Sequence, residues 1–130
     1  MSKNPQIATQ TARVRGLGAA RSGTDHFWKT RLTAVANVPL TIAFVVIVLM
    51  LARRDYAGAM ALVGNPAVAI LLLLFIGSAT IHMRLGMQVI IEDYVHAEGT
   101  KIVLLMLNTF FAVAVGFASA YAILKIGFAG

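Results

Sequence analysis

The 130-residue sequence contains no cysteine and few charged side chains. Without cysteine, the chain can form no disulfide and can hold no iron–sulfur cluster through thiolates. Charged residues make up 12% and hydrophobic residues 59% of the chain. Soluble domains typically have about 25% and about 45–50%, so a soluble core of this length could not hide so much apolar surface. The composition is therefore typical of a membrane protein.

Three apolar runs, at about 32–52, 66–91 and 102–124, occupy most of the chain. Each is near or above the ~20 residues that a helix needs to cross a ~30 Å hydrocarbon core. Helices and closed barrels alone satisfy the backbone in lipid, and continuous runs of this length favour helices. We therefore predict an all-α membrane protein, in which residues 25–130 form a domain of three transmembrane helices.

Basic residues are concentrated before the first run. Six of the eleven lysines and arginines lie there: Lys3, Arg13, Arg15, Arg21, Lys29 and Arg31. Residues 1–24 have the polar composition of a mobile basic tail, and no short apolar core with a cleavage site marks a signal peptide. A basic tail can bind nucleic acid, but beside a spanning helix it more often marks the cytoplasmic side, so we expect no nucleic-acid partner.

The placement of positive charge also predicts the topology. With three spans, the six N-terminal bases and Lys101 share one side, whereas Arg53, Arg54 and Lys125 lie on the other. The positive-inside rule places the N-terminus in the cytoplasm, or in the matrix of a mitochondrion, and the C-terminus on the opposite side. We favour the bacterial inner membrane, although an Arg-rich, acid-poor start also suits a mitochondrial transit peptide.

The second apolar run contains an unusual residue, His82. An ionisable side chain at membrane depth is costly and is by default a functional hypothesis. On a helix, His82, Gly86, Val89 and Asp93 form one stripe. Gly86 would let a flat macrocycle or another helix approach the backbone. Asp93 follows roughly 16 Å along the axis from His82, with Tyr94 at interface depth.

Each of these residues also has a simpler interpretation. An intramembrane histidine can hydrogen-bond to a neighbouring helix without holding any cofactor. Tyr94 can be an interfacial aromatic residue, and Asp93 with Glu92 a solvated helix end. The occurrence of His82, Gly86, Asp93 and Tyr94 together separates a cofactor site from these simpler interpretations better than any single residue does.

The segment from His82 to Tyr94 (HMRLGMQVIIEDY) closely resembles the smaller membrane anchor subunit of succinate dehydrogenase, or complex II. In that family, a histidine followed at this spacing by glycine and then Asp-Tyr marks the second of three helices. The resemblance extends over residues 25–124. It is specific in the second helix, moderate at residues 28–34 (WKTRLTA), and weak in the third helix.

The resemblance implies a role for each residue of the motif. It makes His82 an axial ligand of haem b, Tyr94 a hydrogen-bonding partner of a ubiquinone carbonyl, and Asp93 its support. Only one histidine lies at membrane depth, so a second axial ligand would come from a partner chain and the haem would be shared. Arg31 and Arg84 are candidate contacts to a haem propionate or to an interface, or anchors in the lipid headgroups.

The resemblance also implies three protein partners besides the lipid bilayer: a second anchor (cytochrome b) subunit, an iron–sulfur subunit and a flavoprotein subunit. The chain would help to pass electrons from succinate to the quinone pool and would not be catalytic alone. Two alternatives remain: a cofactor-free three-helix structural or assembly subunit, such as a transporter accessory, and the anchor of a quinol:fumarate reductase.

The topology is tested with reporters fused after Gly130 in a bacterial host. We expect a reporter that is active only outside the cytoplasm to give a signal, because an odd number of spans separates the two termini. Signal only from a cytoplasmic reporter at the same position would contradict the topology.

Overall fold

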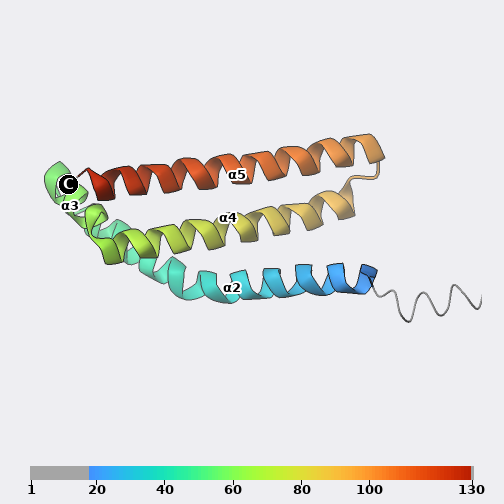
Figure 1. Ribbon diagram of the computed structural model, residues 1–130, viewed down its shortest axis with the longest axis horizontal. Helices are drawn as coiled ribbons and strands as arrows, with labels where there is room; N and C mark the ends of the chain where they lie inside the picture. The colour runs from blue at the N-terminus through green and yellow to red at the C-terminus, as the bar shows by residue number, and fades with distance from the viewer. Residues whose placement is uncertain (1–17, 130) are drawn as a thin grey trace, which may run out of the picture.

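The computed structural model describes the backbone of residues 18–129 and the side chains of residues 23–129. Every element within that part of the chain is helical: α2 (Gly18–Leu51), α3 (Tyr56–Gly64), α4 (Pro66–Tyr94) and α5 (Glu98–Phe128) (Figure 1). The segments Gly23–Leu51, Pro66–Tyr94 and Glu98–Phe128 are long and apolar enough to cross a membrane. The prediction of an all-helical chain with three candidate spans is confirmed.

The long helices extend beyond the apolar runs. Residues 92–94, expected in a loop, form the last turn of α4, and residues 98–101 form the first turn of α5, so the connection is only three residues long. Helix α2 begins at Gly18, before the expected domain boundary at residue 25, while residues 1–17 of the expected tail lie outside the described residues. Polar residues extend a helix readily where it leaves the hydrocarbon, because backbone bonding does not depend on apolar side chains.

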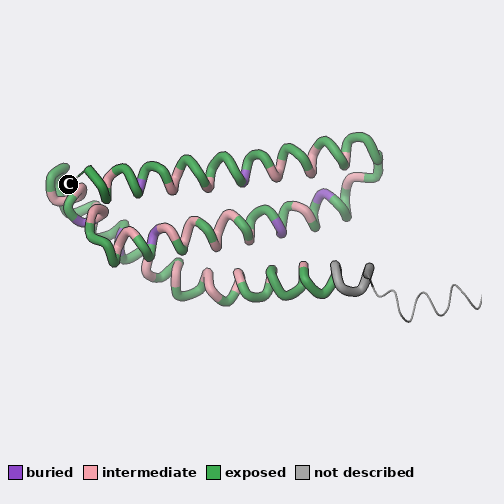
Figure 2. Tube along the Cα trace, in the orientation of Figure 1, coloured by how far each residue is buried: buried purple, intermediate pink, exposed green. Residues whose placement is uncertain are grey.

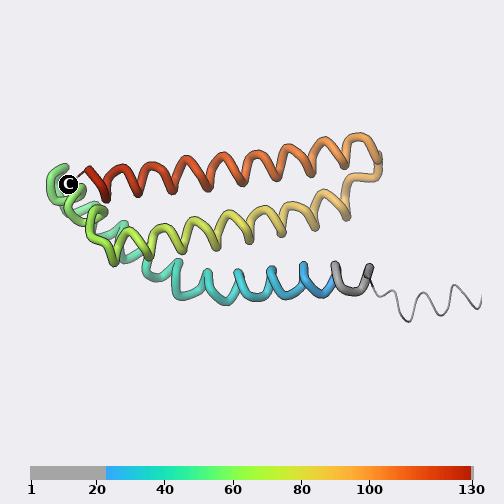
Figure 3. Tube along the Cα trace, in the orientation of Figure 1, coloured from blue at the N-terminus to red at the C-terminus, as the bar shows by residue number. Residues whose placement is uncertain are grey.

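The three long helices lie side by side in one row, with α4 in the middle (Figures 1 and 3). Helix α4 packs against both α2 and α5, whereas within the described residues α2 and α5 make no contact with each other. The beginning of α2 and the α4–α5 turn lie at one end of the row, and α3 lies at the other. The site residues on α4 are therefore placed between two helices that do not enclose them.

Helix α3 turns the chain between α2 and α4, and its caps explain its position. The Asp55 side chain accepts a hydrogen bond from the backbone N–H of Gly58 at 2.9 Å, which satisfies one free donor of the first turn. Asn65 ends α3 and caps α4 by accepting from Ala67 N–H at 2.9 Å. Pro66 then occupies the first turn of α4, where its missing N–H costs little.

Apolar packing is concentrated at the α3 end of the row. Ile47, Leu72 and Ile123 form a buried cluster, and the rings of Phe44 and Phe75 stack nearby with centroids 4.4 Å apart. Figure 2 shows that most of each long helix is exposed or half-buried. Because large hydrophobic side chains are exposed along all three helices, lipid or other chains must cover them.

Candidate functional site

His82 lies on α4 and faces α2, and its imidazole is half-buried. Its Nδ1 atom is 3.2 Å from the hydroxyl oxygen of Thr33, which is contributed by α2. The Thr33 hydroxyl also lies within hydrogen-bond distance of the backbone carbonyls of Lys29, at 2.8 Å, and Thr30, at 3.1 Å. When its one hydrogen is directed to either carbonyl, the Thr33 oxygen can accept a hydrogen bond from Nδ1–H of His82.

In the tautomer with the proton on Nδ1, the lone pair of Nε2 of His82 is free. Within the side chains that the structure describes, no hydrogen bond involves Nε2. One turn further along α4, a Cβ atom on Gly86 would meet nothing within 4 Å. A flat group or a partner helix can thus approach this part of α4 without a clash from this chain.

A second contact fixes the same junction between the two helices. The Ser78 hydroxyl, one turn before His82, donates to the backbone carbonyl of Thr33 at 3.3 Å. Thr33 consequently contacts α4 through both its side chain and its backbone. The two contacts determine how α2 and α4 are aligned and hold the imidazole in one orientation.

Two further polar atoms of α2 are buried. Nε2 of His26 and Oδ1 of Asn37 are buried and have no hydrogen-bond partner among the described residues. His26 as a whole is half-buried, and only its Nε2 atom is withdrawn from solvent. His26, Thr33 and Asn37 are spaced at i, i+7 and i+11, which on a helix places them on one face.

Asp93 and Tyr94 lie in the last turn of α4, away from His82. Both side chains are exposed, and Tyr94 retains 77% of its surface. Tyr94 follows His82 by roughly 18 Å along the helix axis. Neighbouring Glu92 accepts a hydrogen bond from Gln88 at 2.8 Å, so this carboxylate is already engaged.

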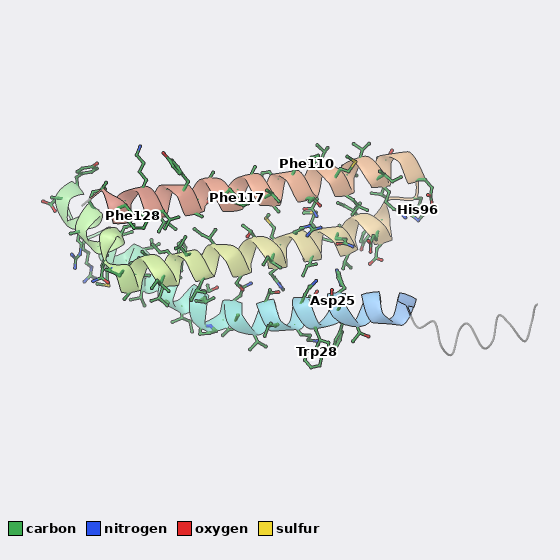
Figure 4. All side chains as sticks on the ribbon, in the orientation of Figure 1. Asp25, Trp28, His96, Phe110, Phe117 and Phe128 are labelled. Atoms are coloured by element: carbon green, nitrogen blue, oxygen red, sulfur yellow. The ribbon has the colours of Figure 1, made fainter. Side chains whose placement is uncertain are left out.

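Two of the side chains labelled in Figure 4, His96 and Trp28, lie near the site residues in sequence but point away from the helix row. His96 lies in the turn between α4 and α5 and is exposed. Trp28 points from α2 away from the other helices and is 65% exposed, as is common for tryptophan in an interfacial aromatic belt.

The two candidate arginines do not meet at His82. The Arg31 guanidinium lies 4.8 Å from the ring centroid of Phe27, on the exposed side of α2. Arg84 faces α5, where its Nε donates to the Thr109 hydroxyl at 3.3 Å. Positions 82 and 84 are separated by roughly 200° around a helix, so within this chain Arg84 is directed away from the imidazole.

Sequence reasoning missed Thr33, Ser78 and the pair Asn108 and Thr109. Asn108 donates through Nδ2 to the backbone carbonyl of Arg84 at 2.9 Å. The i, i+7, i+11 spacing of polar residues on α2 was the available signal for Thr33. No spacing within one helix indicates which neighbouring helix its polar face meets.

The donor set of this chain suits one axial ligand of a haem and no multidentate metal site. Among the described residues, no cluster of three or more His, Cys, Asp or Glu side chains could hold a metal ion. A haem iron requires only one nitrogen from each side of the macrocycle. His82, with Nδ1 engaged and Nε2 free, fits that requirement.

Comparison with known proteins decides the family. A family model described as the succinate dehydrogenase/fumarate reductase transmembrane subunit matches residues 5–116. The succinate dehydrogenase hydrophobic membrane anchor subunit of Paracoccus denitrificans is 31% identical over 114 residues, which cover 88% of each chain. The chain belongs to the succinate dehydrogenase membrane anchor subunits.

Further relatives agree with this assignment. The membrane anchor subunit of Reclinomonas americana is 32% identical over 106 residues, covering 73% of this chain and 82% of the relative. The hydrophobic membrane anchor subunit of Rickettsia bellii is 26% identical over 104 residues, covering 80% and 83%. No solved structure gives a significant match. As a membrane anchor subunit of succinate dehydrogenase, the chain is a multi-pass membrane protein that functions with the other subunits of complex II.

Proposed function

We propose that this anchor subunit supplies one axial ligand to a haem b, through His82, and part of a ubiquinone site, through Tyr94 and Asp93. The single observation that supports the proposal best is the contact between His82 and Thr33, which leaves Nε2 free at a half-buried position. With the partner anchor and the two soluble subunits, the chain would deliver electrons from succinate to the quinone pool. We place it in the bacterial inner membrane.

In this proposal, His82 binds the haem iron through the Nε2 atom of its imidazole. A hydrogen bond from Nδ1–H to the Thr33 oxygen would orient the ring and leave Nε2 to present its lone pair to the iron. When bound, the haem would supply a one-electron relay within the membrane. The second axial nitrogen would come from the cytochrome b subunit, because this chain has no other histidine at the level of His82. Such a shared haem would also hold the two anchors together.

In this proposal, Tyr94 and Asp93 bind the quinone and take part in its protonation. Reduction of a quinone to a quinol takes up two electrons and two protons. The Tyr94 phenol would donate a hydrogen bond to one quinone oxygen and stabilise negative charge as it develops there. Asp93, exposed in the same last turn, would hold or relay a proton from the aqueous side. The electrons would arrive from the iron–sulfur subunit, since this chain has no cysteine.

Replacing His82 with Leu tests the axial ligand. We expect the complex to lose its low-spin haem signal, because leucine keeps the helix apolar but has no donor nitrogen. The measurement is the reduced-minus-oxidised spectrum of the purified complex. His96→Leu, which removes an exposed imidazole at the turn, is the matched control and should leave the spectrum intact. An unchanged haem content in His82→Leu would refute the assignment.

Replacing Thr33 with Val tests the orientation of the ligand. The substitution keeps the shape but removes the hydroxyl that accepts from Nδ1, and such outer partners typically change metal affinity by about 10–100-fold. We expect about tenfold weaker haem retention during detergent washing, with recovery in Thr33→Ser. Equal haem loss in the Ser and Val variants would show that packing, and not the hydrogen bond, matters at this position.

Replacing Tyr94 with Phe tests the quinone contact. Losing one hydrogen bond to a reacting oxygen typically costs about a hundredfold or more in rate. We expect succinate-to-ubiquinone turnover to fall by about that factor, while haem content and succinate oxidation with a soluble acceptor persist. Tyr121→Phe, at an exposed tyrosine on α5, serves as the control. Turnover within about twofold of the parent enzyme would mean that Tyr94 is only an interfacial aromatic residue.

A further inference from the structure

Arg84 is a cation in a membrane-spanning helix without a carboxylate in contact. Its Nε donates to the Thr109 hydroxyl at 3.3 Å, and the side chain is exposed. Within the described side chains, the one ion pair joins Lys29 and Asp25, at the beginning of α2. A guanidinium has five N–H donors, and it binds phosphate and carboxylate groups in bidentate geometry. Most of the donors of Arg84 are therefore available to an anion.

An apolar groove of about 320 Å³ begins at Arg84 and runs between α4 and α5. It extends to Leu73 on α4 and Ala120 on α5, which form the end opposite Arg84. The distance from Arg84 to Leu73 is roughly 16 Å along the axis. A Cβ on Gly77, which lines the groove, would meet nothing within 4 Å, so the groove is open at that point.

The level of Arg84 in the membrane follows from the contact between Thr33 and His82. Helices α2 and α4 run in opposite directions, so Arg31 and Arg84 both lie about 3 Å beyond that contact, toward the same end of the row. Tyr94, at interface depth, lies ten residues or roughly 15 Å farther toward that end than Arg84. Arg84 therefore starts inside the hydrocarbon, from where a long basic side chain can reach toward the headgroups, and the groove runs from it toward the α3 end of the row.

We propose that this groove binds an anionic phospholipid, with its phosphate at Arg84 and one acyl chain along α4 and α5. The charge of the guanidinium complements the phosphate, and the length and apolar lining of the groove suit a chain that points toward the membrane centre. Basic pockets between transmembrane helices bind anionic headgroups in this way. A haem held by His82 does not compete for the site, because Arg84 and His82 lie on different sides of α4.

The test uses the whole complex in nanodiscs of phosphatidylcholine that contain a small share of photoactivatable lipid. One probe has a phosphatidylglycerol headgroup and the other a phosphatidylcholine headgroup, with the same reactive acyl chain. In the parent complex, we expect the anionic probe to label the groove peptides of α4 and α5 about fivefold more than the neutral one, as about 1 kcal/mol per arginine implies.

Substitutions at two positions, Arg84 and Gly77, separate the effect of the charge from that of the groove. Arg84→Gln should reduce anionic labelling to the neutral level, whereas Arg84→Lys should retain part of the preference, and Lys125→Gln is the control for a distant basic residue. Gly77→Leu should abolish labelling by both probes, because the side chain fills the groove while Arg84 remains. Gly99→Leu is the matched control, since a Cβ there also meets nothing within 4 Å and Gly99 lies outside the groove.

Equal labelling by both probes in the parent complex would overturn the proposal, as would anionic labelling that survives Arg84→Gln. Subunit composition and haem content are measured in every sample. If Gly77→Leu releases the partner anchor and Gly99→Leu does not, the groove is an interface between subunits and the lipid is rejected.

Discussion

Helix α4 is packed between two neighbours that do not contact each other, and the rest of the structure depends on this arrangement. A row of three helices has two broad faces and no enclosed interior. Hydrogen bonds and packing between helices must therefore be made along two seams. The α2–α4 seam contains Thr33, Ser78 and His82, and the α4–α5 seam contains Arg84, Asn108 and Thr109. Both faces remain for lipid and for the other subunits of complex II.

The two ends of the row differ in chemistry. At the α3 end, stacked phenylalanines and a buried aliphatic cluster hold the helices together without polar groups. Toward the other end, hydrogen bonds from side chains to backbone carbonyls join the helices alongside buried apolar residues such as Leu85 and Ile91. In lipid, where apolar contacts between helices gain little from the hydrophobic effect, such polar contacts determine alignment. The residues proposed for haem and quinone lie in the half of the molecule that polar contacts position.

The sequence was sufficient to predict the three spans, because long apolar runs have few alternatives in a membrane. It also identified His82, Asp93 and Tyr94 as residues of interest, although their roles remain proposals. It did not predict α3, whose Asp55 and Asn65 caps are short-range signals within what looked like a loop. The contact between Thr33 and His82 could not be predicted, because it depends on the alignment of two helices and joins residues that are 49 positions apart. The contacts of Arg84 with Asn108 and Thr109 on α5 could not be predicted either, because they too depend on how two helices are aligned.

The continuity of α4 limits where residues can be inserted into or deleted from such a chain. His82 and Tyr94 belong to one uninterrupted helix, so their separation and relative direction are determined by the number of residues between them. Inserting a single residue would lengthen the gap by only about 1.5 Å but would rotate Tyr94 by about 100°. Two full turns, or about seven residues, would restore the direction and displace the phenol by roughly 10 Å. If His82 and Tyr94 have the roles proposed for them, the twelve-residue step between them is fixed in length, whereas the turns between the helices are free of that constraint.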